Sequence, residues 1–234
     1  MLYALRFPFS LVVLAVGYVL AVGVRGVVQR ALSGAPRLRP ARRTRPRLLP
    51  LARFVDPYGA LCAVLGGVGW GASPDDVPVP LARGRTASRA VAAFVAGPVV
   101  LFGLGTAALV GYDRLTQVRP VGSGLVINTV RGDMLAVDHF HYHVGYGATA
   151  LYLLGVEFLA MALLAVVPLP PMDGGRLLFA LAPKTIGWQR ARYRLEDDNW
   201  GILIMLILSL PIFGEPIIIA IIDAILGPFI TAVT

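Results

Sequence analysis

The sequence has few of the residues that build disulfides and metal sites. Among 234 residues there is one cysteine, Cys62, so an internal disulfide is excluded. The histidines are His139, His141 and His143, which leaves no His-Glu-x-x-His zinc motif anywhere in the chain. Charged residues are also scarce, at 15 % against 57 % apolar residues. This composition predicts an integral membrane protein rather than a soluble enzyme.

Basic residues outnumber acidic ones, 21 to 13, which gives a net charge of +8. Nearly all are arginine, since Lys184 is the single lysine. Because the arginines fall between apolar runs, they indicate membrane orientation and contact with lipid headgroups rather than nucleic-acid binding. The arginine bias, with abundant Ala, Gly and Val, is typical of a GC-rich bacterial genome.

The apolar runs predict an all-α polytopic protein with one membrane domain over residues 1–234 and about four spans of roughly 20 residues each. Arg6 alone precedes the first run, whereas many arginines follow it, so we expect a multi-pass cell-membrane protein with its N-terminus outside. The expected segments are a first span (1–25), a basic cytoplasmic loop (33–55), a re-entrant segment (56–80), a second span (89–111), an outer loop (112–147), a third span (148–183), a cytoplasmic loop (184–198) and a C-terminal span or hairpin (199–234).

Two of these segments carry more specific expectations. The Gly-rich run near residues 60–72 is too short to cross a bilayer, which favours a re-entrant path. In the outer loop, apolar and polar residues alternate in places over Leu125–Val130, which predicts a short β hairpin.

The third span is interrupted by the stretch Val167–Arg176, which contains Pro170, Pro171, Asp173, Gly174 and Gly175. An ionisable side chain at membrane depth usually marks a metal site, a proton path or a buried ion pair. The alternative is a helix break in which the Asp173 carboxylate satisfies freed backbone amides and does no chemistry.

Several stretches resemble, in order, the site-2 proteases, a family of intramembrane zinc metalloproteases. They cover roughly residues 15–185 and are Asp56-Pro57-Tyr58-Gly59, Gly69-Trp70-Gly71-Ala72 with Val77-Pro78-Val79, Ala96-Gly97-Pro98, and Pro168–Arg176 with its Asp173-Gly174-Gly175. The resemblance implies a site-2-protease-like core. It also implies a zinc held by two histidines of a His-Glu-x-x-His motif and by the aspartate that corresponds to Asp173, with the glutamate as general base.

Here that motif is degenerate. If the first span is registered on Gly26 and Arg30, the two histidine positions fall on Ala21 and Arg25, and the glutamate position falls on Val22. We therefore expect no catalytic residues, no zinc and no other cofactor. An active protease would need a metal with non-standard ligands.

Without zinc, the Asp173 carboxylate needs a proton or a cation. Arg25 lies where the second histidine would face Asp173, so we predict a buried Arg25–Asp173 ion pair. The competing interpretation is that Arg25 extends to the cytoplasmic interface and belongs to the basic loop.

Other polar residues leave alternatives open. His139, His141 and His143 share one face of an extended segment and are candidate metal ligands, although an aromatic and imidazole belt at the interface explains them equally well. Glu157, within the third span, is either a contact to another helix or a protonated carboxyl bonded nearby. Glu215 is expected to cap the helix that follows a break in the last apolar run. Asp223, in the same run, leaves the same two alternatives open as Glu157.

Three functions follow. The first is a proteolytically inactive, site-2-protease-like protein that acts as a binding, scaffold or regulatory subunit for other membrane proteins. Backbone beside Pro170 and Pro171 would then accept an extended peptide. The alternatives are an active intramembrane metalloprotease and a structural subunit of a larger membrane complex. The expected partners are membrane lipids and another membrane protein or transmembrane helix, with no nucleic acid.

Overall fold

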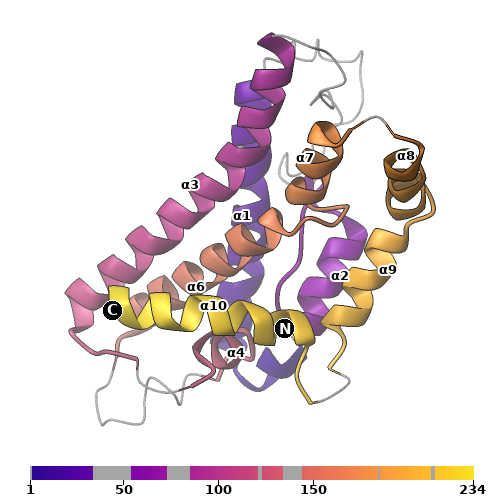
Figure 1. Ribbon diagram of the computed structural model, residues 1–234. Coiled ribbons are helices and arrows are strands. Elements are labelled where there is room, and N and C mark those ends of the chain that lie inside the picture. Colours follow the sequence, from indigo (N-terminus) through magenta and orange to yellow (C-terminus); the bar gives the residue numbers. More distant parts are fainter. Residues whose placement is uncertain are drawn as a thin grey trace, which may run out of the picture.

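The computed structural model describes residues 2–33, 54–72, 85–120, 123–133, 144–183, 185–211 and 214–234. Within these ranges the protein is helical, and its extended pairing is limited to one antiparallel bridge between Val55 and Gly71 (Figure 1). The helical class that the composition predicts is therefore confirmed.

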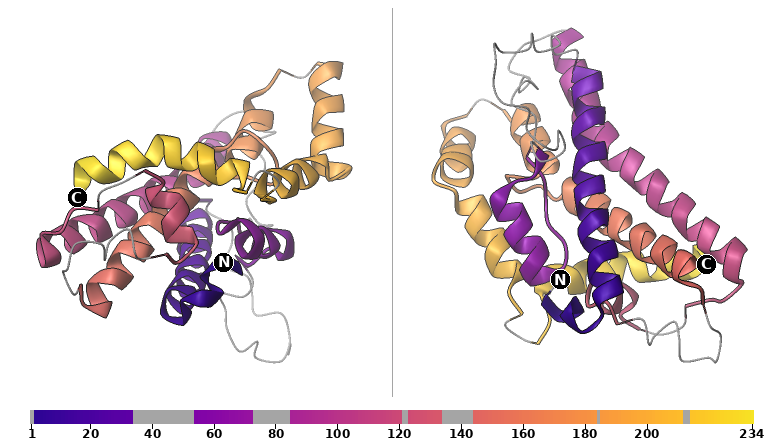
Figure 2. Two further views of the ribbon diagram at one scale, coloured as in Figure 1. Left: turned by 90° about the horizontal axis from the view of Figure 1, so that it is seen from below. Right: turned by 180° about the vertical axis from the view of Figure 1, so that it is seen from behind.

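Three long apolar helices form the body of the protein, and Figures 1 and 2 show them side by side. Between α3 and α6 the backbones approach so closely that a β-carbon built on Gly105 would lie 2.8 Å from the Gly155 carbonyl oxygen. Small residues permit this kind of packing between helices in a bilayer. The helices are α1 (Pro8–Ser33), α3 (Arg85–Thr116) and α6 (Tyr146–Val166), and their stretches long and apolar enough to cross a membrane are Pro8–Leu32, Val91–Thr116 and Tyr146–Val166.

The last apolar run does not form a fourth long helix. It is divided into α9 (Trp200–Ser209) and α10 (Ile217–Val233), which run in different directions (Figure 1). Pro211 and Pro216 flank the break, and a proline cannot donate the backbone hydrogen bond that would continue a helix. The expected four spans thus become three helices of spanning length in the described part of the chain.

The segment Leu125–Val130, predicted as a strand of a β hairpin, is instead the short helix α4. The Asp223 carboxylate of α10 accepts a hydrogen bond of 2.7 Å from the Val126 amide in the first turn of α4. The Thr129 hydroxyl donates to the Leu125 carbonyl at 2.7 Å, and both residues are buried. A contact from nearly 100 residues away along the chain, which local sequence does not encode, therefore satisfies the helix terminus.

The predicted re-entrant segment begins with α2 (Pro57–Gly66). Its first turn is capped by Asp56, whose carboxylate accepts from the Gly59 amide at 2.8 Å. At Gly67 the backbone enters the left-handed region, with φ at 91°, and the chain returns so that the Ala72 amide donates to the Phe54 carbonyl at 2.7 Å. This out-and-back path brings residues 68–72 against α1.

After α6 the chain turns at Val167–Met172 and continues as α7 (Asp173–Leu181). The predicted cytoplasmic loop 184–198 contains α8 (Ile186–Arg192) and a π-helical turn (Tyr193–Asp197), neither of which has a buried residue. A short 3-10 turn, Leu2–Arg6, precedes α1. The buried side chains of α6 form the centre of the core, where Tyr152 and Leu159 pack with Leu109 of α3.

Candidate functional site

Asp173 is the first residue of α7 and lies directly after the turn at Val167–Met172. Gly174 and Gly175 pack so tightly on this turn that a β-carbon at Gly174 would overlap the Val166 carbonyl, and one at Gly175 would overlap the Leu169 backbone. The Asp-Gly-Gly sequence therefore holds the start of α7 against the end of α6. The result is a fixed position for the Asp173 carboxylate.

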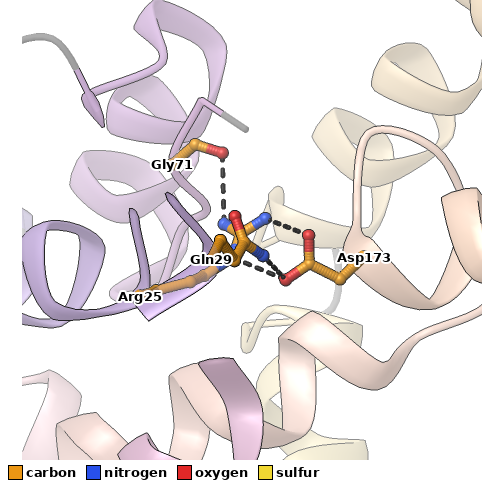
Figure 3. A network of polar contacts seen from close by, with 4 residues as sticks. All are labelled: Arg25, Gln29, Gly71 and Asp173. Carbon is orange, nitrogen blue, oxygen red and sulfur yellow. Dashed lines mark hydrogen bonds and ion pairs between the residues drawn. The ribbon is translucent and has the colours of Figure 1, made fainter. Parts of the chain in front are cut away.

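The Asp173 carboxylate is bound by two side chains of α1 (Figure 3). Arg25 donates from Nε to Oδ2 at 2.6 Å and from Nη2 to Oδ1 at 2.5 Å, so the ion pair is bidentate. Gln29 donates from Nε2 to Oδ2 at 2.7 Å. The third guanidinium nitrogen, Nη1, donates to the Gly71 carbonyl at 3.2 Å. The network thus joins α1, α7 and the segment that follows α2.

Helical spacing explains why Arg25 and Gln29 act together, because residues four apart lie on the same face of α1. The neighbouring helix α3 leaves room for them at Gly97, where an added β-carbon would lie 3.0 Å from Arg25 Cγ. Tyr18 of α1 fixes the position of the segment after α2, because its hydroxyl donates to the Trp70 carbonyl at 2.7 Å.

All three polar side chains are buried: Arg25 is 4 % exposed, Gln29 0 % and Asp173 1 %. A buried ion is stable when its charge is paired and its hydrogen-bonding atoms are satisfied. The planar guanidinium matches both oxygens of the carboxylate, which gives strong charge-assisted hydrogen bonds. The N-terminus of α7 adds a favourable dipole for the Asp173 charge.

The structure brings together the predicted pair, Arg25 and Asp173, and Arg25 does not extend to the interface. The other two motif positions, Ala21 and Val22, are buried in an apolar cluster with Tyr18 and Leu101. Sequence reasoning missed Gln29, although its place one turn after Arg25 was a usable signal. It also missed the Gly71 carbonyl, whose position depends on the fold of the whole segment 54–72.

Two other predictions for carboxylates differ from the structure. Glu157 is 0 % exposed, and neither of its oxygens has a hydrogen-bond partner among the described residues, so the expected bonded carboxyl is not found there. It packs against Gly17 of α1. Glu215 does not cap α10, which has no side-chain cap and begins after Pro216. Its Oε1 lies instead 3.5 Å from Arg131 Nη2.

The backbone beside Pro170 and Pro171 was expected to accept an extended peptide, but at Pro170 it is covered. Gly201 in the first turn of α9 packs directly on the Pro170 carbonyl, where a β-carbon would overlap it. The final apolar run, whose path the sequence left open, occupies this side of the turn.

The residues at the site do not fit the zinc that the family resemblance implies. A zinc site takes three or four Cys, His, Asp or Glu ligands, and a catalytic one keeps an open position. Here both oxygens of Asp173 accept hydrogen bonds from Arg25, which is a cation and not a metal ligand. In the described part of the chain no three potential ligands of this kind gather. His139, His141 and His143 lie outside the described residues, so the structure does not test whether they are metal ligands or part of an interfacial belt.

An apolar groove of about 400 Å³ lies beside the network, with Asp173 in its wall. Its other side is formed by α3 and α6, through Pro98, Val99 and Val166 among others. A second apolar hollow of about 410 Å³ shares these three residues and continues to Phe229 of α10. The two hollows therefore adjoin each other along α3 and α6.

Comparison with known proteins gives no match to a family model, a curated protein or a solved structure. The site-2-protease resemblance accordingly rests on the residues quoted above.

Proposed function

We propose that this chain is a proteolytically inactive, site-2-protease-like membrane protein that binds a transmembrane helix of another membrane protein and acts as a scaffold or regulatory subunit. The observation that carries the proposal is the bidentate Arg25–Asp173 pair, which fills the place where the resemblance implies a metal.

The pair is unsuited to peptide hydrolysis for a chemical reason. Hydrolysis needs a water activated by a metal or by a general base within hydrogen-bond reach. The Asp173 oxygens already accept hydrogen bonds from Arg25 and Gln29, and a guanidinium cannot accept a proton from water. Arg25, Gln29 and Asp173 therefore hold α1, α7 and the segment after α2 together.

The two adjoining apolar hollows along α3 and α6 support binding of a helix. Helices associate in a bilayer through close van der Waals packing, which a shaped apolar surface provides. Val99 lies where the two hollows meet and is 62 % exposed, so a partner side chain can reach it.

The proposal is tested by a photo-crosslinking amino acid placed at Val99 in the native membrane. The matched control is Val12 on α1, which is 60 % exposed and lines neither hollow. We expect a discrete adduct with a second membrane polypeptide from Val99 and none from Val12. Equal crosslinking at both positions, or lipid adducts alone, would contradict helix binding.

Elemental analysis of the purified protein tests the inactive part of the proposal. We expect no stoichiometric zinc and no cleavage of a transmembrane peptide. One zinc per chain that is lost together with peptidase activity in Asp173→Ala would establish the metalloprotease alternative instead.

A further inference from the structure

We propose that the hollow beside Arg131 and Glu215 binds one phospholipid whose headgroup carries both a phosphate and a primary ammonium, as in phosphatidylethanolamine. This site lies on α4 and α10, apart from the Arg25–Asp173 network.

The two charges at the hollow form an open pair. Arg131 Nη2 lies 3.5 Å from Glu215 Oε1, and 29 % and 41 % of the two side chains are exposed. Arg131 also donates from Nη2 to the Gly214 carbonyl at 3.0 Å, which anchors the guanidinium at the rim. An exposed ion pair contributes little stability. A ligand that offers a counter-charge to each partner can therefore compete with this ion pair.

The rest of the hollow is apolar. It has a volume of about 780 Å³ and extends from the charged pair along one face of α10. The face consists of residues spaced three and four apart, with Ile221 half exposed at its centre. An acyl chain fits this apolar surface, which is formed by Ile217, Ala220, Ile221 and Ala224.

The hollow lies near the end of the molecule where the first candidate span begins. Gly132, next to Arg131, packs against Ala4 of the 3-10 turn before α1 and against Ser10 of α1. Because this candidate span begins at Pro8, lipid headgroups are expected at the level of Arg131. Figure 1 shows α4 and the first turn of α10 at the same end of the molecule as the N-terminus.

The pairing of charges selects among lipids. The Arg131 guanidinium donates to phosphate oxygens, which every phospholipid has. The Glu215 carboxylate accepts N–H hydrogen bonds from a primary ammonium, whereas a trimethylated ammonium has no N–H to donate. A phosphatidylglycerol headgroup brings no cation to Glu215. We therefore expect the order phosphatidylethanolamine, then phosphatidylcholine, then phosphatidylglycerol.

The experiment uses the full chain in nanodiscs with equal amounts of these three lipids, all with the same acyl chains. The protein is extracted with mild detergent and the retained lipid is identified by native mass spectrometry. We expect phosphatidylethanolamine to be enriched over phosphatidylcholine by at least about tenfold, as one added charge-assisted hydrogen bond provides. Equal retention of the two lipids, or an excess of phosphatidylglycerol, would overturn the proposal.

Three variants locate the site. Glu215→Gln is expected to abolish the preference between the two zwitterionic lipids, and Arg131→Gln to lower the retention of both. Ala220→Trp keeps the charges and fills the hollow, so it should reduce all retention. The matched control is Arg192→Gln, which removes the partly exposed ion pair between Arg192 of α8 and Glu196 of the π-helical turn and should change nothing. Unchanged lipid retention in the first three variants, with folding verified by circular dichroism, would place the lipid elsewhere.

Discussion

At the scale of single residues, the buried pair of Arg25 and Asp173 determines how the three connected segments are held together. Each charge is stable only because the other is present, since an isolated ion in an apolar interior is several kcal/mol less stable than a paired one. The pair is therefore expected to be strongly coupled in energy, with Gln29 as a third member.

Arg25→Met and Asp173→Leu are each expected to lower the free energy of unfolding by about 3–5 kcal/mol, because each leaves one uncompensated buried charge. The double variant removes both charges and should lose less than either single variant. The measurement is equilibrium unfolding in detergent micelles.

A matched control is Arg192→Met, which breaks the partly exposed pair with Glu196 and should lower the free energy of unfolding by less than about 1 kcal/mol. If the two buried substitutions gave additive losses, the direct pairing of Arg25 with Asp173 would be wrong.

The ion pair could be predicted from sequence because the family resemblance set a register for the first span, and that register placed Arg25 where a zinc ligand would face Asp173. Gln29 was harder to predict, because an uncharged amide near a helix end has many possible roles. The environment of Glu157 was not predictable at all. The residues that pack against Glu157 depend on which face of α6 meets α1. Because apolar residues surround the whole of α6, the sequence does not define that face.

At the scale of elements, the turn between α6 and α7 depends on close backbone contact. Gly174→Ala is expected to lower the free energy of unfolding by about 1–3 kcal/mol, because the added methyl group overlaps the Val166 carbonyl. Backbone cannot yield as a flexible side chain would, so α7 must shift and the Asp173 carboxylate with it.

Gly103→Ala in α3 is the matched control for this substitution. No atom lies within 4 Å of a β-carbon built there, so stability should be unchanged or raised by up to about 1 kcal/mol through helix propensity. Thermal unfolding of both variants gives the comparison. Equal effects at the two glycines would show that helix α7 does not need the tight contact.

The helices differ in how well the local sequence predicts their positions. The long helices α1, α3 and α6 follow from runs of apolar residues and were predictable to within several residues at most ends. The helix α4 was not, because its first turn is satisfied by Asp223 of α10. Glu215 was misassigned for a related reason, since its partner Arg131 is distant along the chain and close only in the fold.

At the scale of the whole molecule, the arrangement of charges predicts the orientation in the membrane. The sequence after the first apolar run is rich in arginine, and α8 with the following π-helical turn carries Arg190, Arg192 and Arg194. Positively charged segments stay on the cytoplasmic side. We therefore expect the N-terminus and the segment after α3 to lie outside.

The single native cysteine makes this orientation directly testable. Cys62 is fully buried, so the parent chain should not react with a membrane-impermeant maleimide. Arg119→Cys, after α3, and Gln189→Cys, in α8, place a thiol at exposed positions separated by α6. In intact cells we expect labelling of Arg119→Cys alone, and labelling of Gln189→Cys only after permeabilisation.

The two thiols test different parts of the expectation. Reversed labelling would keep the crossing by α6 and invert the orientation, so the arginine distribution would not determine topology here. Labelling of both thiols from the same side would mean that the chain, after α6 and α7, returns to the membrane surface on which α3 ends. In that case the Arg25–Asp173 network would join segments that enter and leave at one membrane surface.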